Sequence, residues 1–173
     1  MGGRKQGRKW RGDIPHKFET VEDPYLPKKA PAGEALCPRC HAVFRDKRWF
    51  FDEDFYQEFK ESDLVPKILC PGCRKSLDRY AMGYLTLSGS FFQEHKDEIM
   101  KVVMNEYKRA REKNPLMQII NLTEDEDKMV IETTSERLAQ RLGRAVYKAY
   151  KGDLEFRWAH QDKFVRVYWH RDS

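Results

Sequence analysis

Apolar residues recur with recognisable periods in the C-terminal half of the chain. Tyr80–Leu87 is rich in β-forming residues and is bounded by Ser88 and Gly89, which predicts a strand. Ser90 and Gln93 have the spacing of a capping box and predict the start of a helix, which Asn114-Pro115 ends. The apolar positions of this helix recur near helical spacing at Phe92, Ile99, Val103, Tyr107 and Ala110.

A hairpin and a second helix follow. Leu116–Leu122 and Lys128–Thr133 are short apolar runs on either side of the acidic loop Thr123–Asp127, which predicts a hairpin. Thr133 or Ser135 would cap the next helix, and Gly152 would end it. The buried face of this helix is expected to comprise Leu138, Leu142, Ala145, Val146 and Ala149.

Two alternating segments complete the chain, and both are typical of strands with one buried face. The alternating apolar residues are Leu154, Phe156 and Trp158 in the first segment and Val165, Val167 and Trp169 in the second. The order of elements predicts an α+β fold in which residues 80–173 form a ferredoxin-like β-α-β-β-α-β domain. The last strand would be an extra C-terminal hairpin strand that extends the sheet.

The N-terminal half divides into two parts. Residues 1–34 are predicted to be a disordered, glycine-rich basic tail followed by an extended linker that holds Pro15, Pro24, Pro27 and Pro31. Residues 35–79 contain all four cysteines and an aromatic insertion between them. Phe51, Phe55 and Phe59 are spaced by four, which predicts a short helix over Asp52–Lys60. We expect the aromatic residues to form a small core beside a metal rather than a ligand platform.

The cysteines form two matched motifs, Cys37-Pro38-Arg39-Cys40 and Cys70-Pro71-Gly72-Cys73. Each pair can reach one ion around a tight turn, and two pairs supply the four thiolates of a structural zinc site. The sequence therefore predicts a zinc ribbon bound through Cys37, Cys40, Cys70 and Cys73, with no open position for catalysis. A redox pair is the alternative interpretation. His41 could replace a ligand, but a hydrogen bond to a ligand, or no role, is expected.

The net charge of +5 comes from one end of the chain. Residues 1–12 contribute five of the 33 basic residues and no acid, which leaves 28 basic and 28 acidic residues elsewhere. Such a tail suits nucleic-acid phosphate, although a solubilising tail or a nuclear-localisation-like pattern is the alternative. The RNA contacts predicted in the tail are Arg4, Lys5, Arg8, Lys9, Trp10 and Arg11. Those predicted around the cysteines are Arg39, Arg45, Lys47, Arg48, Arg74, Lys75 and Arg79.

Several classes of protein are not expected. No apolar run is long enough to span a membrane, and the first residues do not resemble a secretory signal, so we expect a cytoplasmic protein without a membrane partner. No hydrolase elbow, P-loop or dinucleotide fingerprint is present. We therefore expect neither an enzyme nor a small-molecule substrate.

The cysteine region resembles a known family. Cys37-Pro38-Arg39-Cys40 followed by Arg48-Trp49 is similar to the zinc-ribbon region of the large-ribosomal-subunit export adaptors, the nonsense-mediated decay protein three family. The segment from Val130 to Ala139, with Gly152 and Val165-Arg166-Val167 after it, is similar to that family's strand-helix-strand segment. In length and ending the chain is closer to short bacterial zinc-ribbon proteins. The resemblance implies association with the ribosome, through the large subunit, and structural zinc without catalysis. The family has eight cysteines and further C-terminal domains, in contrast to this chain.

Three functions follow as hypotheses. The first is a non-enzymatic zinc-ribbon protein that binds RNA and associates with the ribosome. The second is an adaptor that binds a protein partner, and the third is a sensor in which oxidation of the thiols releases zinc.

Overall fold

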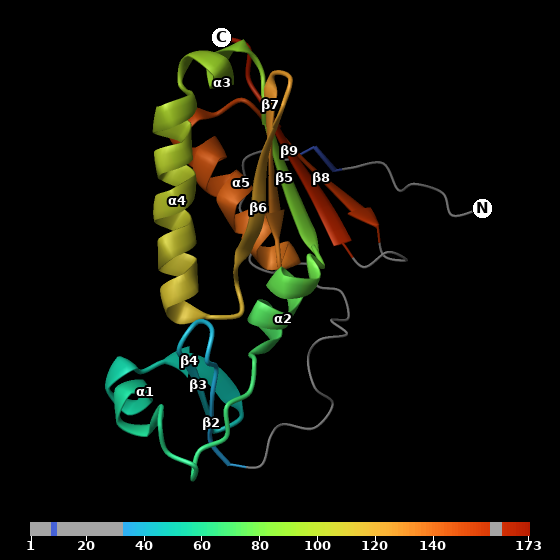
Figure 1. Cartoon of the computed structure of the whole chain (residues 1–173). Coiled ribbons are helices and arrows are strands. Elements are labelled where there is room, and N and C mark those ends of the chain that lie inside the picture. Colours follow the sequence, from blue (N-terminus) through green and yellow to red (C-terminus); the bar gives the residue numbers. More distant parts are fainter. Residues whose placement is uncertain (1–7, 10–32, 160–163) are drawn as a thin grey trace, which may run out of the picture.

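The computed structural model describes residues 8–9, 33–159 and 164–173, so most of the predicted tail and linker lies outside the described residues. Figure 1 shows two regions, with helix α2 (Pro71–Asp78) at the junction between them. We call residues 33–79 the cysteine module and residues 80–173 the sheet domain. The predicted α+β class is confirmed, with a small sheet beside the cysteines and a larger sheet packed against helices.

The cysteine module is built on a three-stranded antiparallel sheet. Its strands are β2 (Ala35–Leu36), β3 (Ala42–Arg45) and β4 (Arg48–Phe51), in the order β2-β3-β4. Asp46 and Lys47 connect β3 to β4 with φ angles of 53° and 64°. Positive φ at both central residues is the requirement of a type I′ turn, whose twist suits a tight hairpin.

Helix α1 (Glu53–Phe59) confirms the short helix predicted in the insertion. The side chain of Asp52 caps it by accepting a hydrogen bond of 3.1 Å from the backbone N–H of Phe55. The buried member is Tyr56, and Phe55 and Phe59 pack beside it, whereas Phe51 belongs to β4 and is 38% exposed. The predicted aromatic core is confirmed: it includes Phe50, Phe55 and Phe59 around Leu36, Val43, Tyr56 and Val65.

The sheet domain begins with β5 (Gly83–Ser88), followed by α3 (Ser90–Glu94) and the long α4 (Lys96–Lys113). The hairpin of β6 (Ile119–Asp125) and β7 (Lys128–Thr133) comes next, then α5 (Glu136–Tyr150) and the strands β8 (Asp153–Ala159) and β9 (Phe164–His170). The predicted hairpin, the second predicted helix and the final pair of strands are present, whereas the first predicted helix is divided at His95 into α3 and α4. The larger sheet has the order β1-β8-β9-β5-β7-β6, where β1 is Arg8–Lys9.

The placement of the last two strands differs from a ferredoxin-like sheet. β9 lies beside β5 and runs parallel to it, with Leu85 opposite Val167, whereas β8 pairs only with β9 and β1. The burial of the side chains gives the reason. Val165, Val167 and Trp169 of β9 are all fully buried, but β8 has Leu154 as its only fully buried residue. The more apolar strand therefore takes the inner position, and the predicted extra strand is inserted into the sheet rather than added at its edge.

Helices α4 and α5 cover the same side of the larger sheet (Figure 1). Gly143 brings α5 close to the sheet, because a Cβ there would lie 2.7 Å from Cγ1 of Val167. Ala149, predicted to be buried, is exposed, since it lies beyond the stripe of α5 that faces the sheet. The fully buried core residues of this domain include Leu85, Leu87, Ile99, Val103, Ile131, Leu138, Leu142, Val167 and Trp169.

The helix start predicted at Ser90 is correct, but its capping box is not. The N-cap is Gly89, which makes no side-chain hydrogen bond, and the Ser90 hydroxyl donates to the backbone carbonyl of Asp172 instead. Gly89 has φ of 106°, and a Cβ there would collide with the carbonyl oxygen of Arg171. The end of the chain therefore occupies the place that capping contacts would need.

Candidate metal centre

The first cysteine pair lies on the turn between β2 and β3. The backbone N–H of Cys37 donates to Ala42 O at 2.8 Å, and the N–H of His41 donates to Cys37 O at 3.0 Å. His41 has a φ of 69°, a left-handed conformation that reverses the chain within a few residues. This compact turn brings the thiols of Cys37 and Cys40 to the same side.

The second pair lies at the N-terminus of α2. Cys70 is the N-cap residue, and Pro71 takes the first helical position, where a missing N–H costs nothing. Cys70 Sγ accepts a hydrogen bond of 3.4 Å from the backbone N–H of Cys73. A helix N-terminus stabilises negative charge, which opposes the effect of the neighbouring thiols that raise the pKa of Cys70.

The four sulfur atoms form one cluster. The Sγ atoms of Cys37, Cys40, Cys70 and Cys73 all lie within 4.8 Å of one another, and those of Cys40 and Cys70 are 3.7 Å apart. Tetrahedral coordination with metal–sulfur bonds of about 2.3 Å places neighbouring sulfur atoms roughly 3.8 Å apart. Cys37, Cys70 and Cys73 are fully buried and Cys40 is half-buried. The cluster could therefore hold a metal ion, with a closed set of four ligands.

Neighbouring donors stabilise negative charge on the sulfur atoms. The backbone N–H of Cys70 donates to Cys37 Sγ at 3.4 Å, and the side-chain amide of Gln118 donates to Cys73 Sγ at 3.3 Å. Hydrogen bonds to metal ligands orient them and tune their basicity. Gln118 comes from the sheet domain, 45 residues beyond Cys73, and nothing in the sequence pattern pointed to it.

The four thiols also compete for protons. Contact with Cys40, then with Cys70 and Cys73, lowers the pKa of Cys37, whereas contact with Cys37 raises the pKa values of Cys40 and Cys70. For Cys73, Cys37 raises the pKa, but Cys40, Cys70 and Gln118 together lower it to about 6. A cation bound by all four sulfur atoms would displace the protons that the cluster holds.

His41 is not a ligand. Its ring stacks on Tyr56 with a centroid distance of 3.9 Å and an interplanar angle of 10°. Its Nδ1 lies 3.7 Å from Glu53 Oε1. The ring packs on the aromatic core, and the backbone N–H donates to Cys37 O.

The metal centre is joined to the sheet domain through α2. A Cβ on Gly72 would lie 2.8 Å from Leu116 Cα, so only glycine permits this approach. The Ser76 hydroxyl donates to Gln118 Oε1 at 2.7 Å, so Gln118 links α2 to the ligand Cys73. Contacts between residues 72–76 and residues 116–118 therefore cross the predicted domain boundary between residues 79 and 80. The boundary itself stays a prediction.

The basic residues predicted to bind RNA differ in accessibility. Arg39, Lys47, Arg48, Arg74 and Arg79 are exposed. Arg45 is half-buried, 3.7 Å from Asp52 and stacked over Phe50. Lys75 is only 4% exposed and donates to the Thr134 carbonyl at 2.9 Å, so its prediction as a phosphate contact is wrong. Through this hydrogen bond the Lys75 ammonium links α2 to the sheet domain.

Most residues of the tail lie outside the part of the chain that the structure describes. The backbone of Arg8–Lys9 forms β1, which pairs antiparallel with β8 opposite Phe156 and Glu155. The predicted contacts Arg4, Lys5, Trp10 and Arg11 lie outside the described residues.

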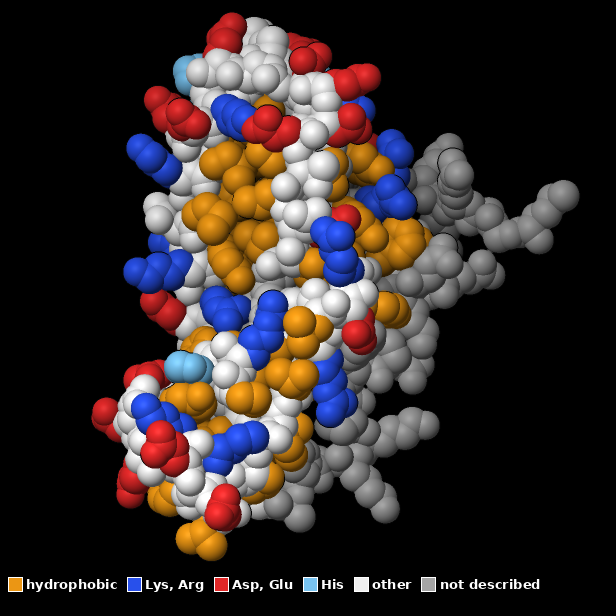
Figure 2. Space-filling model, viewed as in Figure 1, with side chains coloured by type: hydrophobic (Ala, Val, Ile, Leu, Met, Phe, Trp, Pro, Cys, Tyr) orange, Lys and Arg blue, Asp and Glu red, His pale blue; other side chains and the backbone are white. Residues whose placement is uncertain are grey.

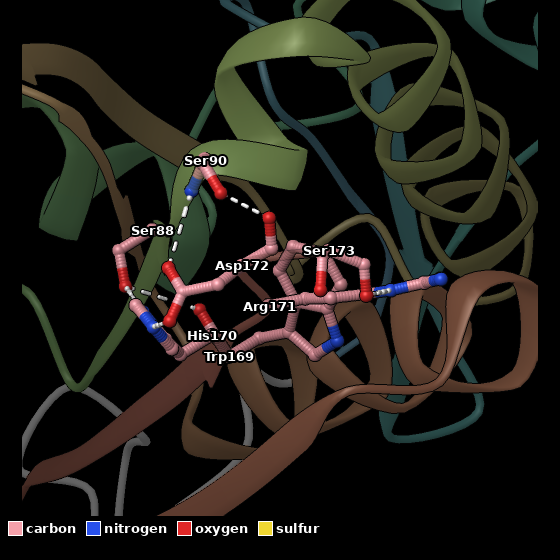
Figure 3. A network of polar contacts seen from close by, with 7 residues as sticks. All are labelled: Ser88, Ser90, Trp169, His170, Arg171, Asp172 and Ser173. Atoms are coloured by element: carbon pink, nitrogen blue, oxygen red, sulfur yellow. Dashed lines mark hydrogen bonds and ion pairs between the residues drawn. The ribbon is translucent and has the colours of Figure 1, made fainter.

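A second polar group lies far from the cysteines, at the end of the chain (Figure 3). Ser88 Oγ and His170 Nδ1 are 2.9 Å apart, and His170 Nε2 is 2.9 Å from Asp172 Oδ2. The Ser90 N–H also donates to the Asp172 carboxylate, at 3.4 Å. The His170 contact, followed by this hydrogen bond, lowers the pKa of Asp172. No nucleophile-base-acid set is visible in the sequence because Ser88 lies 82 positions before His170. The group fastens the chain end to the turn between β5 and α3.

Comparison with known proteins adds no family assignment. No helix in the described part of the chain is long and apolar enough to cross a membrane. No family model, no curated protein and no solved structure matches this chain.

Proposed function

We propose that this chain is a non-enzymatic, zinc-binding protein that binds RNA and associates with the ribosome. Zinc is favoured because four thiolates in a closed tetrahedral arrangement are the usual structural zinc set. The spacing of the four Sγ atoms, all within 4.8 Å, fits that arrangement. When bound, zinc would hold the turn of Cys37 and Cys40 against α2 and so stabilise the cysteine module.

The observation that carries the RNA proposal is the set of exposed cations on this module. Lys47 and Arg48 lie at the tip of the β3–β4 hairpin, and Arg79 ends α2. None of these three forms an ion pair within the described residues, whereas Arg45 is paired with Asp52. Figure 2 shows Lys and Arg side chains around the junction of the two regions, and acidic side chains mainly towards the opposite ends. Such a separation of charge favours a polyanion at the junction.

Aromatic contacts add to this surface. The Arg48 guanidinium lies 5.4 Å from the Phe50 ring centre, and Arg111 of α4 lies 5.6 Å from that of Phe51. RNA-binding proteins combine arginine planes and aromatic rings because unpaired bases stack on both. The ribosome is proposed as the RNA source because of the family resemblance of the cysteine region.

The test compares two charge reversals in the same module. Arg48→Glu changes the proposed surface, and the matched Lys60→Glu changes an exposed lysine at the far end of α1. We expect Arg48→Glu to weaken binding of single-stranded RNA about tenfold and to lower the salt slope by about 0.7–0.9 for the lost phosphate contact. Lys60→Glu should leave both unchanged. Equal RNA affinities for both variants and the wild type would contradict the proposal that RNA binds at this surface. Sedimentation with ribosomes on sucrose gradients tests separately whether the chain associates with the ribosome.

A protein partner is the second candidate. Met104 of α4 and Leu122 of β6 are 41% and 43% exposed, and Figure 2 shows hydrophobic side chains gathered over this part of the sheet domain. Exposed apolar patches often bind other proteins. Retention of a partner after nuclease treatment would favour this function over RNA binding. The thiol sensor is less favoured, because Cys37, Cys70 and Cys73 are fully buried and reactive thiols are accessible.

A further inference from the structure

A cavity of about 320 Å³ lies between α4 and α5, beside Met117, whose neighbour Gln118 contacts the cysteine cluster. Its lining includes Met117, Glu106 of α4 and four basic residues of α5. The basic residues are Arg137, Arg141, Arg144 and Lys148. Nothing in the zinc site or in the predicted RNA contacts uses this group.

The spacing of these residues explains why they converge. Positions 137, 141, 144 and 148 are separated by four, three and four residues, which places them along one stripe of a helix. Like charges at this spacing repel each other, so the stripe weakens the isolated helix. An arrangement that opposes helix stability is expected where an anion binds between the charges.

The protein itself supplies little negative charge here. Glu106 is the only carboxylate among the lining residues that the structure describes. Its Oε1 accepts from Arg141 Nε at 2.6 Å and its Oε2 from Arg109 Nη2 at 2.8 Å. Burial raises the pKa of Glu106, but the two arginines lower it by more than burial raises it. The carboxylate is therefore ionised, and it is paired with both arginines. Four basic side chains therefore face one acid that is already engaged.

Two of the cations are accessible. Arg137 and Lys148 are exposed near opposite ends of α5, and neither forms an ion pair within the described residues. Arg141 is half-buried, and burial lowers the pKa of Arg144, because its charge is partly removed from water. Positive charge in a concave, partly desolvated place attracts anions more strongly than the same charge on a flat surface.

We propose that the groove between α4 and α5 binds phosphate groups. Arginine is suited to this because its planar guanidinium donates two hydrogen bonds to one phosphate. The volume is near the lower limit of ligand pockets and suits a ribose-phosphate unit. The phosphate would come from an RNA chain, in which case the groove extends the RNA-binding function proposed above, or from a free mononucleotide.

The experiment uses the full chain and two matched pairs of charge reversals. Arg137→Glu with Lys148→Glu changes the groove, and Lys101→Glu with Lys108→Glu changes exposed residues of α4 that do not line it. Single-stranded RNA binding is measured by fluorescence anisotropy over a range of salt, and AMP binding by amide chemical shifts. Thermal unfolding confirms that both pairs fold.

If RNA supplies the phosphate, the groove pair binds RNA at least tenfold more weakly, and its salt slope falls by roughly 1.4–1.8 for two lost contacts. The control pair changes affinity by less than about threefold. If a free nucleotide supplies the phosphate, the groove variant no longer shows amide shift changes on addition of AMP, and its affinity for RNA is unchanged. Groove and control pairs that behave alike with both probes would overturn the inference. A wild-type chain that binds no RNA would instead contradict the proposed RNA function, and the AMP arm would still test the groove.

Discussion

The sheet domain and the cysteine module are stabilised by different means. In the sheet domain, α4 and α5 bury a continuous core against β5, β7 and β9, and its largest fully buried side chain is Trp169. In the module, the buried apolar cluster beside the cysteines comprises Leu36, Val43, Tyr56 and Val65. So small a core needs a metal or a covalent link for stability. We propose that a metal bound by the four cysteines stabilises the module as apolar packing stabilises the sheet domain.

The comparison also shows that the two regions are not independent. Gly72 contacts Leu116, and Gln118 contacts both Ser76 and the sulfur of Cys73. The sheet domain thus supplies a rigid support for half of the ligand set. We expect a change at this junction to affect metal binding more than the stability of the sheet domain.

The largest expected effect is the loss of one ligand. Cys70→Ser should abolish stable metal binding and unfold the module, because metal affinity and local folding are coupled. Amide spectra should then lose dispersion for residues 35–69 and keep it for the sheet domain, and metal analysis should fall far below one equivalent. Leu64→Ser, at a site that is 88% exposed in the same module, is the control and should keep its metal. A dispersed module in metal-free Cys70→Ser would show that the apolar cluster suffices.

The next largest effect is expected in the core of the sheet domain. Leu142 is fully buried, so Leu142→Ala should lower the free energy of unfolding by about 2–5 kcal/mol without changing the metal content. Urea unfolding followed by circular dichroism measures the change. Leu77→Ala, at a site that is 56% exposed, should cost less than about 0.5 kcal/mol. Metal loss in Leu142→Ala would mean that the two regions unfold together.

A smaller effect is expected from Gln118→Ala. The substitution removes the donor to Cys73 Sγ and the acceptor for Ser76 but leaves all four ligands. Loss of such a supporting contact weakens metal affinity by about 10–100-fold. Competition with a chromophoric chelator measures this affinity. Gln57→Ala, which removes an exposed contact with Glu53, is the control. Unchanged affinity in Gln118→Ala would mean that the junction does not support the ligands.

The smallest effect concerns Glu106 and depends on pH. Its pKa is lowered by Arg141 and Arg109, so its contribution to stability is present above the pKa of the unfolded chain and is lost as the pH falls through the lower folded value. Glu106→Gln should therefore destabilise by less than about 1 kcal/mol at neutral pH, and the difference from the wild type should vanish in acid. Thermal unfolding from pH 7 to pH 3 measures it. With Glu112→Gln, an exposed site on the same helix, no such trend is expected.

Local signals predicted much of the fold, and distant contacts account for what was missed. The cysteine motifs, the hairpin around Thr123–Asp127 and the helix capped by Ser135 could be predicted because their patterns lie within a few residues. The position of β9 between β5 and β8 depends on which of the last two strands buries more apolar side chains, and this cannot be deduced from the pattern within a single strand. Helix α2 was missed because Pro71 and Gly72 within it are usually helix breakers.

The functional residues follow the same division. The cluster of four cysteines could be predicted from spacing, whereas the contact of Gln118 and the proposed groove residues of α5 required the tertiary structure. Lys75 looked like a phosphate contact because it follows Cys73-Arg74, but the packing of α2 on the sheet domain buries it. Exposure, which decides whether a lysine can bind RNA, is a property of the folded chain.

The central claim is that a bound metal holds the RNA-binding surface in place. The most direct test measures the affinity of the full chain for single-stranded RNA with zinc bound, after chelation, and after zinc is restored. We predict that removal weakens binding about tenfold or more, because the hairpin with Lys47 and Arg48 loses its fixed position, and that added zinc restores it. Equal affinity in all three states would contradict the claim.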